Sequence, residues 1–291
     1  MITSEPRRFA GLPLDRVRLM GIVNVTPDSF SDGGETLAPD AAVARGLAML
    51  DEGADIVDVG GESTRPGASP VPVEEERARV VPVVRALARA GALVSIDTRR
   101  AAVMRAAIEE GARIVNDVTA LREAEALPLI ARFDVSVVLM HMQGEPRSMQ
   151  QDPRYDDAAA EVCAWLAARG VACVAAGIPP ERIAVDPGIG FGKTLAHNLA
   201  ILGDLARYRD LPYALLLGVS RKRFIAALDR DMPPQRRLAG SLAAAIACVE
   251  AGAHIVRVHD VGETRQALAV YDALAGRAGK PRWAGPNSRD S

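Results

Sequence analysis

The sequence predicts an α/β fold, a single (β/α)8 TIM barrel in which each of eight parallel strands is followed by a helix. Short apolar segments alternate with longer amphipathic segments along the chain, and this alternation requires crossover connections and hence a parallel sheet. The length of 291 residues suits one barrel, and no linker rich in proline or serine divides it. An open doubly wound sheet is disfavoured because no G-x-G-x-x-G motif follows the first strand.

The predicted strands are the short apolar runs. They comprise residues 19–25, 56–60, 93–97, 114–117, 135–140, 183–186, 214–219 and 255–258. Together with the helices between them they assign residues 1–275 to one barrel domain. Residues 276–291 are polar and punctuated by glycine and proline, so we expect a loosely held tail there.

Helical patterns fill the intervals between these strands. They cover residues 40–52, 74–90, 100–110, 156–169, 236–251 and 261–275. A glycine stands at the end of four of them, at Gly53, Gly91, Gly111 and Gly252, and glycine readily takes the left-handed conformation that ends a helix. The interval 121–133 is short and gives the weakest helical signal.

Composition limits the possible functions. The net charge of −2 gives no general attraction to nucleic acid or anionic lipid. Cys163, Cys173 and Cys248 are odd in number and form no CxxC pair, so neither a disulfide framework nor a zinc site is expected. No apolar run approaches the length of a membrane span and the N-terminus is polar, so the expected compartment is the cytoplasm.

Polar residues follow every predicted strand. In a barrel these strand ends meet at one mouth, where function resides. A single Asp or Asn at such a position is most often a helix cap, but repetition at every strand end favours a ligand site. The residues are Asn24, Glu62, Thr64, Arg65, Asp97, Asn116, Asp117, His141, Asp186, Lys193, Ser220, Arg221, Lys222, Arg257 and His259.

Two carboxylates suggest the kind of ligand. Asp97 and Asp186 each end an apolar run, so inward-facing side chains would be buried. A buried carboxylate is costly unless it is paired or hydrogen-bonded. A flat heterocycle with adjacent N–H donors would satisfy it, because a carboxylate accepts two parallel hydrogen bonds.

Arg257 and His259 suggest an anion. Their spacing of two residues on one strand places both side chains on the same face. With Asn24 they could hold a phosphate or pyrophosphate, helped by backbone N–H groups near a helix start. By contrast, Arg223 is expected in surface ion pairs, and no decision is possible for His141.

The remaining histidines, His197 and His254, have the pattern of ordinary helix and loop residues. Gly192-Lys193-Thr194 resembles the end of a Walker A loop, but Pro187 stands where that motif needs its first glycine. Proline has no N–H to offer a phosphate, so a P-loop is excluded. The glycines here more readily allow the backbone to approach a ligand, with Phe191 as an apolar wall.

In this order, the motifs resemble the dihydropteroate synthase family, the folate-pathway enzymes targeted by sulfonamides. The resemblance runs from residue 19 to residue 259 and continues through the last predicted helix. Arg223 stands where related enzymes often carry a small residue. The motifs that carry the resemblance are residues 20–34, 60–67, 95–98, 116–117, 186–193, 220–222 and 257–259.

The resemblance implies condensation of 6-hydroxymethyl-7,8-dihydropterin pyrophosphate with p-aminobenzoate, assisted by Mg²⁺ and carried out by a homodimer. It implies pterin contacts from Asp97, Asn116, Met140, Asp186 and Lys222. It implies pyrophosphate contacts from Asn24, Thr64, Arg257 and His259, with Asn24 on the metal. It implies p-aminobenzoate contacts from Phe30, Thr64, Arg65, Pro66, Phe191 and Lys222. Catalytic roles fall by the same resemblance to Asp32, Asp97, Lys222, Arg257 and His259, with Asp32 in a loop that closes once pyrophosphate is bound.

The residue inventory agrees with this chemistry. No Ser/His/Asp set or activated cysteine is evident, so covalent catalysis is not indicated. If pyrophosphate departs early, the enzyme must stabilise a polyanion and a transient pterin cation and hold an amine in line. Mg²⁺, Arg257 and His259 suit the polyanion, and anionic Asp97 suits the cation.

Two alternatives share part of this pattern. A methyltetrahydrofolate:corrinoid methyltransferase would use similar Asp and Asn contacts to a pterin. It does not need the pair Arg257 and His259 or the Thr64-Arg65 site, so these residues argue against it. A non-catalytic pterin-binding barrel is the other alternative, and an assay of pyrophosphate release would distinguish it.

Overall fold

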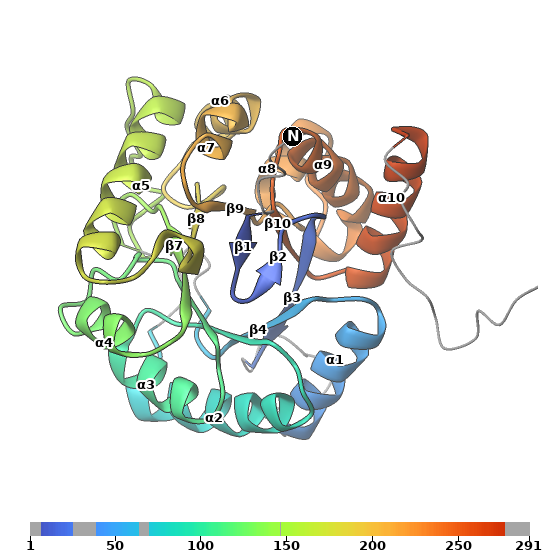
Figure 1. Ribbon diagram of the computed structural model, residues 1–291. Helices are drawn as coiled ribbons and strands as arrows, with labels where there is room; N and C mark the ends of the chain where they lie inside the picture. Colours follow the sequence, from blue (N-terminus) through green and yellow to red (C-terminus); the bar gives the residue numbers. More distant parts are fainter. Residues whose placement is uncertain (1–6, 26–38, 64–69, 146, 277–291) are drawn as a thin grey trace, which may run out of the picture.

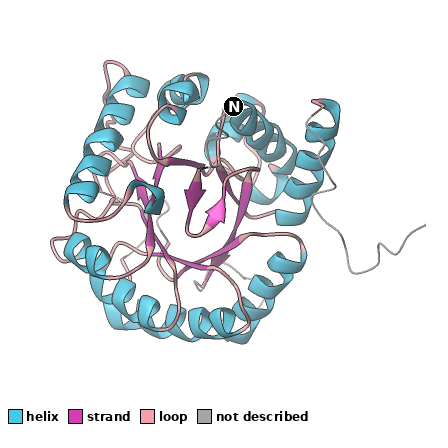
Figure 2. Ribbon diagram, viewed as in Figure 1, coloured by secondary structure: helices cyan, strands magenta, loops and turns pink. Residues whose placement is uncertain are grey.

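The computed structural model describes residues 7–25, 39–63, 70–145 and 147–276, and these form a closed barrel of eight parallel strands inside a layer of helices (Figures 1 and 2). The strand order around the barrel is β10-β3-β4-β5-β6-β7-β8-β9. The predicted (β/α)8 fold is therefore confirmed. Residues 277–291 lie outside the described part, so the tail remains a prediction.

The barrel strands follow the predicted runs closely. They are β3 (Arg18–Asn24), β4 (Ile56–Gly60), β5 (Val94–Asp97), β6 (Ile114–Asp117), β7 (Ser136–Met140), β8 (Ile183–Asp186), β9 (Ala214–Leu217) and β10 (Ile255–Val258). Four have the predicted limits. The largest difference is in β9, whose last residue in the sheet is Leu217 rather than residue 219.

The outer layer consists of helices from each crossover. They are α1 (Pro39–Asp51), α2 (Val73–Arg89), α3 (Ala101–Glu109), α4 (Ala126–Arg132), α5 (Ala158–Ala175), α6 (Leu195–Gly203), α7 (Leu205–Arg209), α8 (Arg223–Leu228), α9 (Leu238–Glu250) and α10 (Val261–Leu274). Gly53, Gly91, Gly111 and Gly252 have φ values of 105°, 86°, 110° and 102°, which confirms the predicted left-handed helix ends. The predicted helix 156–169 is too short, because α5 continues to Ala175.

Helix α6 begins with a capping box. The Thr194 hydroxyl accepts a hydrogen bond from the His197 N–H, and His197 Nδ1 accepts one from the Thr194 N–H. His197 is therefore an ordinary helix residue, as predicted. The use of Thr194 as a cap also supports the exclusion of a P-loop at Gly192-Lys193-Thr194.

Helix α5 has the length and apolar composition of a membrane span, with a mean hydropathy of 1.5. It packs against β7, β8, α6 and α7 as part of the outer layer, and 39% of it is buried. Its apolar character is explained by this packing against the barrel strands and the neighbouring helices. The three cysteines are buried and form no disulfide with one another, with Cys163 and Cys173 in α5 and Cys248 in α9.

A small N-terminal hairpin was not predicted. Strands β1 (Arg8–Phe9) and β2 (Leu12–Pro13) pair antiparallel around Ala10 and Gly11, both of which have positive φ, as in a tight hairpin turn. In Figure 1 the hairpin lies across the barrel opening. Phe9 is fully buried among residues of the barrel interior, namely Met20, Ile56, Ile114, Val138, Ala184, Ala214, Leu216 and Ile255.

We expect Phe9→Ala to lower the free energy of unfolding by about 3–5 kcal/mol, because it removes a large side chain from the packed barrel interior. Denaturant unfolding measures this. Since the polar strand ends lie at the opposite opening, the folded variant should bind ligands at that mouth as the parent does. Weakened ligand binding with unchanged stability would contradict the assignment of Phe9 to the core.

Candidate active site

The carboxyl ends of the strands bring the predicted polar residues to one level of the barrel. In the register of the sheet, Asn24 pairs with Gly60, Gly60 with Asp97, and Asp97 with Asn116. On the other side, Met140 pairs with Asp186. Because the strands are parallel and in this register, their terminal side chains surround a common mouth.

An ion-paired cluster occupies this mouth. Arg257 Nε lies 2.6 Å from Asp58 Oδ2, and Arg257 Nη2 lies 2.7 Å from Asp97 Oδ2. The Asn116 side-chain amide donates to the same Asp58 oxygen at 3.0 Å. A forked guanidinium can satisfy two carboxylates at once, so Arg257 holds together two acids that would otherwise repel each other.

Asp58 was missed in the sequence because only strand ends were considered. It lies in the middle of β4 between two valines, is fully buried, and faces the barrel interior. A charged residue inside a short apolar strand was the available signal. Among the described residues, neither Asp58 Oδ1 nor Ser95 Oγ has a hydrogen-bond partner, and Ser95 is the residue paired with Asp58 on β5.

The ionisation of Asp97 is strongly affected by this setting. Burial raises the pKa of Asp97 to about 7, the guanidinium of Arg257 opposes the rise, and the negative charge of Asp58 adds to it. Asp97 therefore titrates near neutral pH.

A second acid and a lysine face each other across Gly218. A methyl group added there would lie 3.8 Å from Lys222 Nζ and 3.9 Å from Asp186 Oδ2. The other oxygen, Asp186 Oδ1, accepts a hydrogen bond from the Gly188 N–H at 2.8 Å. Burial raises the pKa of Asp186, and the charge of Lys222 opposes this. Burial lowers the pKa of Lys222 to about 8, with Asp186 opposing.

Phe191 borders this pair as an apolar wall. Lys222 Nζ lies 4.8 Å from the centroid of the Phe191 ring, within reach of a cation–π contact, and also donates to the Ile189 carbonyl. The ring packs against a small cluster that includes Met140. The buried members of this cluster are Val118, Met140, Met142 and Met149.

His259 is oriented by a neighbouring hydroxyl. Ser220 Oγ accepts a hydrogen bond from the His259 N–H at 3.3 Å and lies 3.0 Å from His259 Nδ1. A serine hydroxyl accepts up to two hydrogen bonds and donates one, so which group donates in the contact between Ser220 Oγ and His259 Nδ1 depends on the tautomer of the imidazole. Either way, the contact fixes the orientation of the His259 ring. Arg257 lies in β10 and His259 directly follows it, but Arg257 reaches β4 and β5 whereas His259 contacts the segment after β9.

Two neighbouring arginines differ from this set. Arg221 has a φ of 57° and forms an ion pair with Asp260, so its role is structural. Arg223, the first residue of α8, is exposed, and none of the described residues forms an ion pair with it, so the expected surface ion pair stays a prediction.

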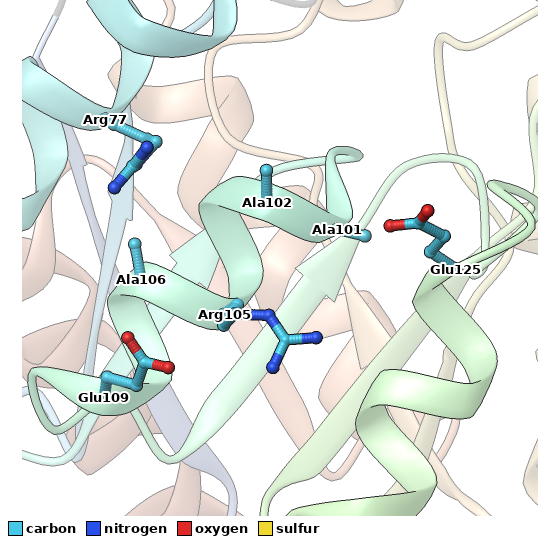
Figure 3. A pocket seen from close by; sticks show the side chains of 7 residues that line it. All are labelled: Arg77, Ala101, Ala102, Arg105, Ala106, Glu109 and Glu125. Atoms are coloured by element: carbon cyan, nitrogen blue, oxygen red, sulfur yellow. The ribbon is translucent and has the colours of Figure 1, made fainter.

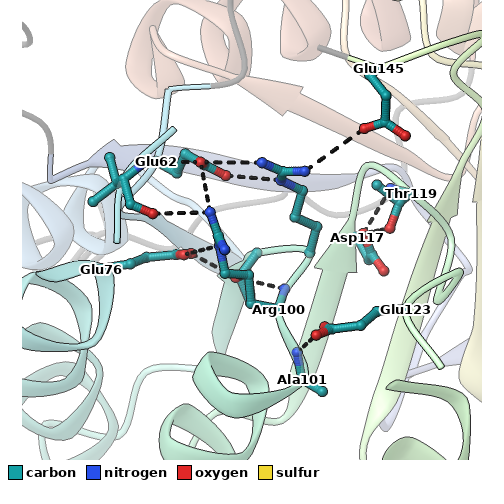
Figure 4. Close-up of polar contacts among 11 residues, drawn as sticks. Glu62, Glu76, Arg100, Ala101, Asp117, Thr119, Glu123 and Glu145 are labelled. Carbon is teal, nitrogen blue, oxygen red and sulfur yellow. Dashed lines mark hydrogen bonds and ion pairs between the residues drawn. The ribbon is translucent and has the colours of Figure 1, made fainter. Parts of the chain in front are cut away.

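A polar network holds the loops after β4 and β5 (Figure 4). Glu62 accepts hydrogen bonds from Arg99 Nε and from the Val71 N–H, both at 3.1 Å, and Arg100 Nη2 lies 3.4 Å away. Burial opposes ionisation of Glu62, but these donors and charges outweigh it and lower its pKa. Glu62 thus joins the two ends of the segment that contains residues 64–69.

Residues 26–38 and 64–69 lie outside the described part of the chain. The implied contacts of Phe30, Asp32, Thr64, Arg65 and Pro66 lie there and remain predictions. The described residues gather into three groups at one mouth: the Asp58–Arg257–Asp97 cluster with Asn116, the Asp186–Lys222 pair with Phe191, and the Ser220–His259 pair.

A hollow of about 210 Å³ lies away from the barrel mouth, on the outside of the barrel. Figure 3 shows the side chains that line it. Its lining comes from α2, α3 and the residue before α4, namely Arg77, Ala101, Ala102, Arg105, Ala106, Glu109 and Glu125. None of the residues at the barrel mouth contributes to it.

The described residues contain no group of three or more His, Cys, Asp or Glu side chains arranged to hold a metal. Mg²⁺ does not require such a group, because it commonly takes one or two protein oxygens together with phosphate oxygens and water. Asn24 ends β3 at the mouth and its amide makes no hydrogen bond to another described residue, so its oxygen fits that limited role.

Comparisons with known proteins identify the family of this chain. Residues 20–259 match the family described as pterin binding enzyme. The dihydropteroate synthase of Neisseria meningitidis serogroup C is 49% identical over 265 residues, covering 90% of this chain and 94% of the relative.

Solved structures give the same result. The Xanthomonas albilineans dihydropteroate synthase with 4-aminobenzoic acid is 49% identical, with a TM-score of 0.87 over 94% of this chain and 99% of that one. The Burkholderia cenocepacia dihydropteroate synthase complexed with 7,8-dihydropteroate is 43% identical, with a TM-score of 0.85 over 94% and 98% of the two chains. The chain belongs to the dihydropteroate synthase family of pterin-binding transferases.

Proposed function

We propose that the barrel mouth carries out the reaction of this family, the condensation of 6-hydroxymethyl-7,8-dihydropterin pyrophosphate with p-aminobenzoate to give 7,8-dihydropteroate and pyrophosphate. The observation that carries the proposal is the Asp58–Arg257–Asp97 cluster, with Asn116 beside it, at the same mouth as Asp186 and Lys222. Supporting it, the Xanthomonas relative holds 4-aminobenzoic acid and the Burkholderia relative holds 7,8-dihydropteroate.

Release of pyrophosphate, followed with and without p-aminobenzoate, tests the reaction directly. A non-catalytic pterin-binding barrel would release none. A transferase should release it in proportion to the pteroate formed.

The pterin is assigned to the acids and the amide. Asp186 offers Oδ2 while Oδ1 remains on the Gly188 N–H, and unpaired Asp58 Oδ1 offers a further acceptor. Asn116 and Lys222 add donors, and Met140 adds an apolar surface on which a flat ring can pack. This set of acceptors and donors matches the alternating N–H and C=O groups of a pterin edge.

The leaving group is assigned to Asn24, Arg257, His259 and, outside the described residues, Thr64. Mg²⁺ at Asn24 would neutralise charge on pyrophosphate. His259, whose ring is oriented by its contact with Ser220, would donate to the anion from Nε2. Arg257 would also stabilise the anion, in competition with its two carboxylates.

The p-aminobenzoate site is assigned to Phe191 and Lys222 together with Phe30, Thr64, Arg65 and Pro66. Lys222 would face the carboxylate or the ring from its position over Phe191. The aromatic amine is neutral at pH 7 and therefore needs no strong base. Asp97, when ionised, would stabilise the positive charge that develops on the pterin as pyrophosphate departs. Asp32 is assigned to the loop that closes over the site once pyrophosphate is bound.

A homodimer in the cytoplasm completes the proposal. An apolar hollow of about 380 Å³ on the outer surface, lined by residues of α6, α7, α8 and α9, supports a second copy as partner. Leu228 at the end of α8 is one of its lining residues and is 58% exposed. Sedimentation of the purified chain measures the assembly.

Asp186→Asn should weaken pterin binding by about tenfold or more, because an unmatched buried donor costs about 1–3 kcal/mol. The substitution keeps an oxygen for the Gly188 N–H, so the melting temperature should change little. Calorimetric titration with the pterin alcohol gives the affinity. A purely structural Asp186 would show the reverse, with lost stability and parental affinity.

His259→Ala should weaken binding of the pterin pyrophosphate by about tenfold but leave binding of the pterin alcohol unchanged, because only the former carries the anion. Equal losses of affinity for the pterin pyrophosphate and the pterin alcohol would exclude His259 from the leaving-group site. Asn24→Ala should raise the Mg²⁺ concentration needed for half-maximal activity. Arg257→Ala is a poorer probe, because it also leaves Asp58 and Asp97 unpaired.

Affinity for the pterin alcohol should fall as the pH drops below about 7, because Asp97, whose pKa is raised to about 7, then loses its negative charge. The alcohol has no phosphate to titrate. Asp97→Asn should bind weakly without this pH dependence, and Asp58→Asn should move the midpoint to lower pH by removing a like charge. A dependence that persists unchanged in Asp97→Asn would contradict the assignment.

A further inference from the structure

Lys193 is a buried cation without a carboxylate partner. The residue is 3% exposed, and no Asp or Glu of the described chain forms an ion pair with it. Burial lowers the pKa of Lys193 to about 7, with the charge of Asp186 opposing from a distance. A lysine in such a place requires full hydrogen bonding in compensation.

Its ammonium group finds three acceptors. Nζ lies 3.1 Å from His141 Nδ1, 3.2 Å from the His141 carbonyl oxygen and 3.0 Å from the Phe191 carbonyl oxygen. An ammonium has three N–H donors, so all are used. Burial, assisted by the charge of Lys193, lowers the pKa of His141 to about 3, which keeps its ring neutral and able to accept.

These acceptors belong to two loops that touch through their backbones. His141 directly follows β7, and Phe191 lies in the loop after β8. Gly188 and Gly192 have φ values of 70° and 59°. A Cβ at Gly188 would lie 2.0 Å from the His141 carbonyl oxygen, so the approach is possible only for glycine.

The same loops carry groups of the pterin and p-aminobenzoate sites. Met140 precedes His141, and the His141 N–H donates to the Asp186 carbonyl oxygen at 3.0 Å. Phe191, whose carbonyl receives Lys193, supports Lys222 with its ring. A shift of either loop would displace Asp186 and Phe191 relative to each other.

We propose that Lys193, with His141, is a positioning residue that fixes the loops after β7 and β8 and thereby the placement of Asp186 and Phe191 for substrate binding. This role rests on the proposed function, since it names what those two side chains are placed for. Lys193 itself is too deeply buried to touch substrate, and its donors are already occupied.

The test compares Lys193→Met and His141→Leu with His254→Leu. His254 is a matched control, because its Nδ1 also accepts a hydrogen bond, from the Leu215 N–H at 3.0 Å, but it precedes β10 at the opposite end of the barrel. Each purified variant is titrated with the pterin alcohol by calorimetry. Its KM for p-aminobenzoate, its kcat and its melting temperature are measured alongside.

Lys193→Met and His141→Leu should weaken pterin affinity and raise the KM for p-aminobenzoate by about tenfold, since a misplacement of about 1 Å has effects of this size or larger. His141→Asn, which keeps an acceptor near the Nδ1 position, should recover most of the loss. His254→Leu should lower the melting temperature and leave both binding constants at parental values.

Parental pterin affinity and KM in folded Lys193→Met would overturn the role. If Lys193→Met does not fold, equal binding constants for His141→Leu and His141→Asn would overturn it instead. A parent protein that binds the pterin but releases no pyrophosphate would refute the proposed reaction without touching this inference, because loop placement is read from binding.

Discussion

Pairing of buried charge at the barrel mouth is the interaction on which the site depends. Asp58 and Asp97 approach each other only because the guanidinium of Arg257 stands between them. Removing one member of such a cluster leaves an uncompensated buried charge, which is far more costly than the net worth of the contact. The order β10-β3-β4-β5 makes the contact possible, since Arg257 reaches across β3 to two acids on the next strands.

Rigid loops extend this constraint from the strands to the rim. Asp186 ends β8, but its carboxylate is aimed by the Gly188 N–H, and that glycine packs directly against the backbone after β7. Lys193 joins the same two loops, because its Nζ contacts His141 Nδ1 after β7 and the Phe191 carbonyl oxygen after β8. The groups proposed to hold substrate are thus fixed before a ligand arrives, which reduces the entropy that binding must remove.

The sequence predicted the barrel because its evidence was periodic. Apolar runs and helix-ending glycines such as Gly53 and Gly111 repeat along the chain, and local geometry decides both. Strand-end residues such as Asp97 and Asn116 were found because parallel topology brings all strand ends together. Each of these inferences required only local pattern and one topological rule.

What could not be predicted depends on contacts between distant segments. The hairpin around Phe9 has strands of two residues, too short for a periodic signal, and is held by the barrel it covers. Asp58 was hidden inside an apolar strand, and the Ser220–His259 pair joins residues from separate crossovers. The sequence excluded Lys193 from a phosphate-binding loop but gave it no other role, because no sequence pattern shows that its amine contacts His141 and Phe191.

The unsatisfied atoms of the mouth connect stability with function. Asp58 Oδ1 and Ser95 Oγ are buried without a hydrogen-bond partner among the described residues, while Asp58 Oδ2 and Asp97 Oδ2 accept from Arg257. Each such atom costs about 1–3 kcal/mol. A ligand whose N–H groups reach them would recover that free energy on binding. Stability and binding would thus be coupled through the same two atoms, Asp58 Oδ1 and Ser95 Oγ.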